Sequence, residues 1–173
     1  MILTGREIEK QIQNGAIEID PFNPSQLNPN SYNLCLGPDL AWYALDQGEL
    51  NPRTKNRTYR ERIPDTGMVL QPGRLYLGHT LERTASMAFV PMLEGRSSVA
   101  RLGVTVHQTG GVGDLGFNGQ WVLEISAIHP VRIYPGMQIC QVIFLQASGE
   151  VTPYVGRYQG QSGPVECRLH LDH

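Results

Sequence analysis

The sequence lacks the features that mark proteins of nucleic acids, of membranes and of the oxidising extracellular space. Its 14 basic and 16 acidic residues give a formal net charge of −2, so no basic surface for DNA or RNA is expected. No apolar run approaches the roughly 18 residues that span a membrane. The three cysteines are odd in number and far apart, and no signal peptide is recognised. We therefore expect reduced thiols in a cytoplasmic protein.

The sequence also lacks a zinc motif. Its histidines are His79, His107, His129, His170 and His173, and none of them forms the closely spaced pair of a zinc site. The H-x-E and P-C-x-x-C patterns of zinc-dependent cytidine deaminases are absent as well. We expect no zinc cofactor, and we interpret His107 as a histidine of the core or of a pocket rim.

Neither a dinucleotide-binding fingerprint nor an alternation of strands and helices is present, whereas short apolar segments are frequent. Pro-Gly and glycine-rich turns separate these segments, which is typical of all-β sandwiches and barrels in a single domain, here residues 1–173. Strands are expected at 32–36, 68–70, 74–82, 87–93, 103–108, 120–128, 131–134 and 138–144. A capping box at Thr4 to Glu7, with Gly15 as a stop, predicts one short helix.

Residues 51–62, NPRTKNRTYRER, carry five basic side chains and one acidic one. They contain too few apolar residues for a core element, which favours a solvated excursion, and no strand is expected in them. A basic lip that gathers a polyphosphate is the alternative. We place no site residue there.

The stretch 94–124 holds most of the residues that suggest chemistry. Gly95-Arg96-Ser97-Ser98 predicts a tight turn that enters one or two helical turns, ended by Gly103. Free backbone N–H groups, two hydroxyls and a guanidinium suit an anion such as phosphate. Because serine is most often a helix cap, a capped helix with a solvated arginine is an equally good interpretation.

Arg101 and Glu124 form the second feature of this stretch. Arg101 follows Ser97 by four residues, which places both on one helix face. Glu124 is the only charge in the apolar run 120–128. A carboxylate there is costly unless it has a partner or serves chemistry, so Arg101 is its predicted partner. A strand-edge glutamate that points to water remains the alternative.

The glycine-rich loop 109–117 is the third feature, with four glycines in nine residues. Such a loop permits close approach of the backbone to a ligand, or it is simply a turn. Asp114 could bind a sugar hydroxyl with the ring of Phe117 beside the sugar. An aspartate among glycines is also a common turn former.

Several motifs together resemble the dCTP deaminase branch of the trimeric dUTPase superfamily. They are RSSVAR at 96–101, D-x-G-F-x-G at 114–119, VLE at 122–124, YPGMQICQVIF at 134–144 and YQGQSGP at 158–164, with a weaker likeness at 70–82. The resemblance spans most of the chain. It implies a mainly β protein, a distorted β-barrel or jelly roll of the dUTPase-like type with one or two short helices. It also implies a homotrimer with sites at subunit boundaries.

The same resemblance implies a zinc-independent hydrolytic deamination of dCTP. Glu124 matches the family's catalytic glutamate, which takes a proton from water and passes one to N3 of the base. Ser97 and Arg101 match the serine and arginine that orient water and glutamate. Asp114 is implied as the residue that positions a water for attack on the α-phosphate.

The resemblance further implies a set of nucleotide contacts. Within RSSVAR, which also includes Val99 and Ala100, the residues Arg96 and Ser98 are expected to bind phosphates. Asp114 is expected to bind the 3′-hydroxyl, and Phe117 is expected to face C2′, where it would exclude a ribose hydroxyl. Backbone groups around Val122 and Leu123 are expected to read the base, and Tyr154, Arg157 and Gln161 are expected to close over the triphosphate. Residues 154–173 would then act as a lid. Mg²⁺ is expected through the phosphates rather than through protein ligands.

Some positions depart from the family pattern. Gly110 and Gly113 stand where the family has alanine and an apolar residue, which predicts a looser loop, and Asn33 replaces an aspartate. Tyr154 and Arg157 are closer together than is usual, which weakens those two assignments. Val112 stands where strict deaminases carry a basic residue, which favours the bifunctional reaction from dCTP to dUMP and pyrophosphate.

Other functions remain open on the sequence. A monofunctional deaminase would stop at dUTP, and a non-catalytic relative would sense nucleotides or bind proteins. A simple dUTPase is disfavoured, because YQGQSGP replaces its glycine-rich C-terminal motif. Expected ligands are dCTP and dUTP as substrates and dTTP as a candidate inhibitor.

Overall fold

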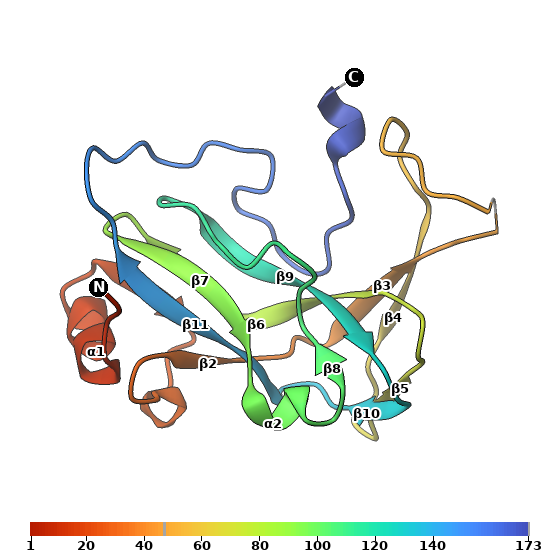
Figure 1. The fold of residues 1–173 in the computed structure, drawn as a ribbon, viewed down its shortest axis with the longest axis horizontal. Coiled ribbons are helices and arrows are strands. Elements are labelled where there is room, and N and C mark those ends of the chain that lie inside the picture. Colours follow the sequence, from red (N-terminus) through yellow and green to blue (C-terminus); the bar gives the residue numbers. More distant parts are fainter. Residues whose placement is uncertain (47, 173) are drawn as a thin grey trace.

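The computed structural model describes residues 1–46 and 48–172, and in this part of the chain the strands form three antiparallel sheets (Figure 1). The largest sheet holds β1 (Ile17–Asp20), β3 (Asp39–Tyr43), β4 (Thr58–Arg62), β6 (Tyr76–Ser86), β8 (Val104–Thr105) and β9 (Asn118–Ala127). The second holds β2 (Tyr32–Cys35), β7 (Phe89–Gly95) and β11 (Gln138–Gln146). The third pairs β5 (Met68–Leu70) with β10 (Val131–Ile133).

The helices are short and lie at the margins of the sheets. They are α1 (Gly5–Gln13), α2 (Ser97–Ala100) and the 3-10 turns η1 (Pro24–Gln26) and η2 (Leu169–Asp172). The N-cap half of the predicted capping box is confirmed, because the Thr4 hydroxyl accepts the Glu7 N–H at 3.3 Å, whereas the Glu7 carboxylate binds Gln11 and Lys10. No helix among residues 1–46 and 48–172 is long and apolar enough to cross a membrane.

One hydrophobic core joins the two larger sheets. Leu34, Val142 and Phe144 from the three-stranded sheet and Leu123 and Ile125 from β9 are all fully buried. Two sheets around one core make a mainly β domain, which confirms the predicted fold class. Hydrogen bonding within the described residues does not join the sheets into one closed barrel.

The strand β9 carries the site face of the large sheet. Its residues alternate strictly between buried and half-buried, with Trp121, Leu123 and Ile125 turned inward and Val122 and Glu124 on the other face. Alternation follows from the two-residue period of a strand. The apolar residues around Glu124 therefore fix on which face its carboxylate lies.

The prediction for residues 51–62 is wrong in part. Residues 58–62 form β4, which pairs with β3 from Asp39 opposite Arg62 to Tyr43 opposite Thr58. The side chains of β4 are nevertheless mostly exposed, as predicted. Backbone hydrogen bonds to β3 hold the strand, so it needs no apolar face of its own. Its polar sequence therefore did not predict a strand.

Candidate functional site

A pocket of about 400 Å³ lies between β9, the glycine-rich loop 109–117 and the C-terminal segment. Six of the predicted site residues line it: Asp114, Phe117, Val122, Glu124, Tyr154 and Gln161. Four of them come from residues 114–124, and Tyr154 and Gln161 come from the tail. The fold thus gathers the residues predicted to contact the sugar and the base.

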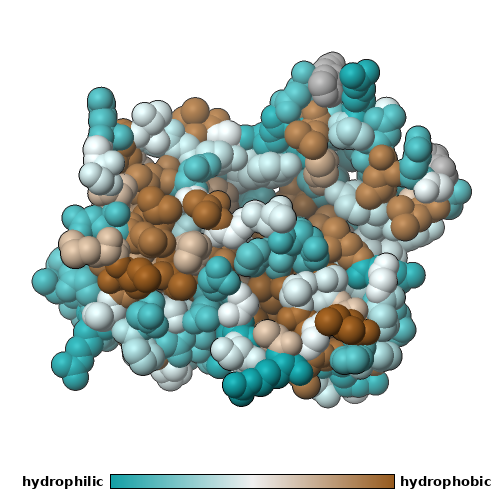
Figure 2. Space-filling model, viewed as in Figure 1, coloured by the Kyte–Doolittle hydropathy of each residue, from teal (hydrophilic) through white to brown (hydrophobic). Residues whose placement is uncertain are grey.

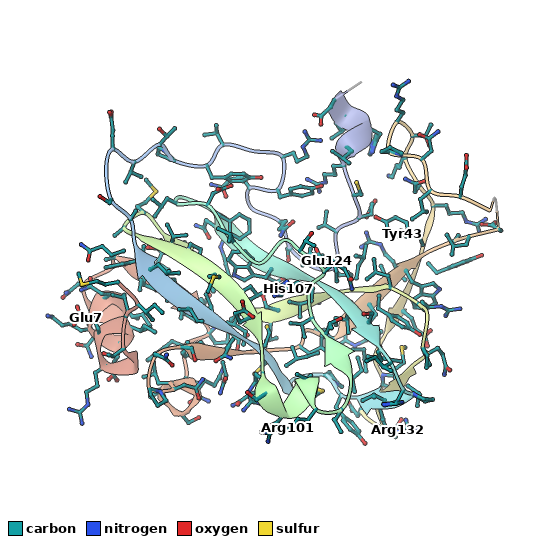
Figure 3. All side chains as sticks on the ribbon, in the orientation of Figure 1. Glu7, Tyr43, Arg101, His107, Glu124 and Arg132 are labelled. Atoms are coloured by element: carbon teal, nitrogen blue, oxygen red, sulfur yellow. The ribbon has the colours of Figure 1, made fainter. Side chains whose placement is uncertain are left out.

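Glu124 is half-buried in this pocket, near the middle of the molecule (Figure 3). Burial raises the pKa of its carboxyl group above the usual value of 4.5, although the Gln108 N–H and the nearby His107 act in the opposite direction. A carboxyl group with a raised pKa is suited both to accept and to return a proton near neutral pH. The site therefore holds a candidate general acid and base.

His107 is a neighbour of Glu124 that the sequence did not assign to the site. Its Nδ1 atom is buried and has no hydrogen-bond partner among the described residues. Its ring also lies against the loop, where a Cβ atom on Gly111 would be 3.0 Å from Cε1. Only its position directly before the glycine-rich loop hinted at this location.

The glycine-rich loop runs along β7. The Leu93 N–H donates to the Gly111 carbonyl at 2.6 Å, and the Gly113 N–H donates to the Pro91 carbonyl at 2.8 Å. Trp121 fills the space where a side chain at Gly113 would lie. Gly113 is therefore packed against Trp121 and hydrogen-bonded to Pro91, whereas Gly110 has open space around it, and the looser loop stays a prediction.

The turn at residues 95–98, which was predicted to bind phosphate, does not line this pocket. Arg96 is the N-cap of α2, and Gly103 ends this turn with a φ of +77°, as predicted. Arg96 donates from Nη1 to the Gln138 carbonyl at 2.9 Å. Of the remaining motif residues, Val99 is buried in the core, and Ser97, Ser98, Ala100 and Arg101 are exposed. None of the six lines the pocket.

Arg101 and Glu124 do not meet within one chain. Figure 3 shows Arg101 on α2 at the edge of the molecule and Glu124 at its centre. No ion pair joins the two residues, both of which the structure describes. The predicted pairing is thus wrong for a single chain. A site that contains both residues requires a second copy of the chain.

The tail residues differ in their positions. The Tyr154 ring packs edge-on against Phe117, with ring centres 6.0 Å apart. Gln161 donates from Nε2 to the Gln120 carbonyl at 2.9 Å, and its own carbonyl accepts the Gln120 N–H at 3.0 Å. Arg157 instead donates to the Arg168 carbonyl at 2.7 Å and to the Asp172 carboxylate, so it is bound within the tail.

Two of the basic residues of 51–62, Lys55 and Arg60, bind this tail. Arg60 donates to the Glu166 carboxylate at 2.6 Å, and Lys55 lies 3.9 Å from it. Partial burial by itself raises the pKa of Glu166, but its own backbone N–H, Arg60 and Lys55 hold that pKa below the usual value. Glu166 also lines the pocket. The sequence did not suggest that residues 51–62 contact Glu166 in the tail.

The residues around the pocket suit a magnesium ion that is already bound to a nucleotide, rather than one held by protein side chains alone. No three His, Cys, Asp or Glu side chains gather as a metal site in 1–46 and 48–172. The pocket is nevertheless lined by the carboxylates of Asp114, Glu124 and Glu166. Mg²⁺ commonly binds one or two carboxylates together with substrate phosphates, so this donor set fits an ion that arrives with a polyphosphate.

Comparisons with known proteins agree with the sequence motifs. The model of a family described as dCTP deaminase-like matches residues 2–147. A dUMP-forming dCTP deaminase of Hathewaya histolytica is 48% identical over 173 residues, with 99% of both chains covered. A protein of the same description from Clostridium acetobutylicum is 46% identical, with 99% of this chain and 98% of its own covered.

A solved structure supports the fold. The 2′-deoxycytidine 5′-triphosphate deaminase of Agrobacterium tumefaciens matches with a TM-score of 0.66 at 20% identity. The match covers 84% of this chain, which spans about half, 48%, of that deaminase. At this identity the likeness concerns the fold alone.

Proposed function

The chain belongs to the dCTP deaminase-like family, and from this premise we propose that it converts dCTP to dUMP, ammonia and pyrophosphate. The observation that carries the proposal is Glu124, a half-buried carboxylate with a raised pKa, in one pocket with Asp114 and Phe117. The relatives described as dUMP-forming support the second half of the reaction.

The first step is a hydrolytic deamination. Glu124 takes a proton from water, whose oxygen attacks C4 of the cytosine, and passes a proton to N3. Glu124 then passes the remaining proton of the attacking water to N4, and collapse of the tetrahedral intermediate breaks the C4–N4 bond, which releases ammonia and leaves dUTP. No zinc is required, because the carboxylate and its neighbours activate the water.

The second step breaks the bond between the α- and β-phosphates. Asp114, exposed at the pocket, positions a water for attack on the α-phosphate of dUTP, and pyrophosphate leaves. Mg²⁺ bound to the triphosphate would neutralise charge on the leaving group. Phe117 faces C2′ of the sugar, and Tyr154 and Gln161 close the pocket from the tail.

The active assembly we propose is a homotrimer in which α2 of one chain completes the pocket of the next. Within one chain the arginine and serines of RSSVAR lie away from the pocket, so the phosphate contacts are missing there. Figure 2 shows apolar side chains gathered over β7 and β11. They include the half-buried Val90, Met92, Ile143 and Leu145 and the exposed Val112. A strip of this kind suits contact between copies.

Separation of the products tests the proposal. Purified protein is incubated with dCTP and Mg²⁺, and nucleotides and ammonia are quantified over time. The expected result is dUMP and ammonia in equal amounts. Accumulation of dUTP would support the monofunctional deaminase instead. Binding of dCTP without turnover would support a nucleotide sensor. Parallel reactions with added dTTP test whether it inhibits.

A further inference from the structure

Gly113 and Trp121 fit together at the start of the segment that carries Asp114. A Cβ atom on Gly113 would lie 2.2 Å from the Cη2 atom of Trp121 and 3.0 Å from Pro91. The φ of Gly113 is not in the left-handed region, so the backbone itself would accept a side chain there. The indole ring, rather than backbone conformation, therefore excludes every other residue from position 113.

The backbone of β9 and its neighbour β6 fix the position of this indole. The pairing of β6 with β9 is irregular between His79 and Arg83, opposite Trp121. There the Trp121 N–H donates to the Thr80 hydroxyl at 2.9 Å, and the indole Nε1–H donates to the Thr84 hydroxyl at 2.8 Å. Both threonines are buried. Bulges of this kind re-aim side chains beside functional sites.

The same indole contacts the far end of the segment. The rings of Trp121 and Phe117 have centres 5.0 Å apart and are inclined by 48°. Phe117 also packs edge-on against Tyr154. Trp121 thus touches the residue before Asp114 and the ring three residues after it, and all four residues line the pocket.

We propose that Trp121 is a positioning residue for the sugar subsite. Its indole occupies the space beside Gly113 and so holds Asp114 and Phe117 in place, and the position of these two residues sets the preference for deoxyribonucleotides. This inference rests on the proposed function, in which Phe117 faces C2′ of the nucleotide. If the Phe117 ring moved away from C2′, the pocket would have room for a ribose hydroxyl. Loss of the indole should therefore impair discrimination between dCTP and CTP more than it impairs turnover of dCTP.

The experiment compares kcat/KM for dCTP and CTP in four proteins: wild type, Trp121→Ile, Gly113→Ala and the double variant. Trp121→Ile should lower the ratio of the dCTP value to the CTP value at least about tenfold, within the range that single pocket contacts provide. Gly113→Ala should also lower it, because its methyl group displaces the indole. In the Trp121→Ile background the same methyl group has room, and its effect should nearly disappear.

Ile125→Val is the matched control, because Ile125 is a buried β9 residue that does not line the pocket. It should lower the melting temperature and leave the ratio unchanged. If Trp121→Ile cannot be purified, Gly113→Ala carries the test, since it removes no core volume. An unchanged ratio, equal effects of Gly113→Ala in both backgrounds, or a wild type that accepts CTP as well as dCTP would overturn the inference. A wild type without dCTP turnover would instead contradict the proposed function.

Discussion

At the scale of single residues, Glu124 is a half-buried carboxylate that forms no salt bridge within the described part of the chain. Burial raises its pKa, and the basic side chain expected beside it lies on α2 at the edge of the molecule. The same burial that makes the charged carboxylate costly to the fold also makes it useful to the reaction. A site that favours the protonated carboxyl group binds and returns protons readily.

Glu124→Gln should therefore abolish deamination and leave dCTP binding nearly intact, because the amide keeps the shape of the side chain and cannot accept the proton. Turnover should fall at least about 10²-fold, the usual contribution of a general acid or base. Calorimetry measures the binding and ammonia release the turnover. Glu18→Gln, at an exposed carboxylate of β1, is the control and should behave as wild type. A Glu124→Gln protein that retained turnover would exclude the assigned role.

The pH dependence of stability tests the surroundings of Glu124. In the proposed trimer, Arg101 of a neighbouring chain supplies a cation, so Arg101→Ala leaves Glu124 with the surroundings of its own chain, in which burial outweighs the Gln108 N–H and His107 and raises its pKa. A raised pKa gives stability that is present below the unfolded value of about 4.5 and is lost as pH rises through the folded pKa. Arg101→Ala/Glu124→Gln should therefore melt at a higher temperature than Arg101→Ala at pH 8, with a smaller difference at pH 4. Equal differences at both pH values would contradict the raised pKa.

At the scale of elements, β9 organises the site at both of its ends. Near Ala127 it pairs with β8, but residues 118–120 lie beyond β8 and are bound by the tail instead. The Gly160 N–H donates to the Asn118 carbonyl at 2.9 Å, and the Gln120 N–H donates to the Gln161 carbonyl at 3.0 Å. The tail thus satisfies the open edge of the strand and forms one wall of the pocket.

Hydrogen exchange tests the tail as a lid. Residues 157–164 have few apolar contacts, so they should gain protection when a non-hydrolysable dCTP or dUTP analogue binds with Mg²⁺. Truncation before Arg157 should lower turnover far more than melting temperature. Residues 5–13 of α1 serve as the internal control and should exchange equally with and without the analogue. Unchanged exchange at 157–164 under saturation would assign the segment to an interface instead.

At the scale of the whole molecule, the separation of α2 from the pocket makes the assembly part of the catalytic proposal. Mixed trimers of Ser97→Ala and Glu124→Gln subunits test it directly. Each variant should be inactive alone. If Ser97 and Glu124 of different chains serve one site, some sites with both wild-type residues form on mixing and activity returns.

Two results would argue against the shared site. Mixed trimers without activity would place Ser97 and Glu124 in the same chain's site, although Glu124 lines the pocket and Ser97 does not. A monomer by light scattering would remove the proposed trimer altogether. Mixing Glu124→Gln with itself under the same refolding conditions controls for activity gained through handling.

The sequence by itself determined the mainly β class, the short first helix and the turn that Gly103 ends, and it named six residues that the structure brings to one pocket. These features depend on local patterns: the two-residue period of β9, the capping residues of α1 and motifs of a few adjacent residues. Such patterns are legible without knowledge of distant contacts.

Only the tertiary structure decided that His107 lies beside Glu124, that Arg60 binds Glu166 in the tail, that Trp121 occupies the space at Gly113, and that Arg101 lies away from Glu124 in its own chain. Each of these facts concerns the relative position of residues from different segments of the chain. Their meeting depends on strand order and register, which arise from the packing of the whole core, so no local pattern could reveal it.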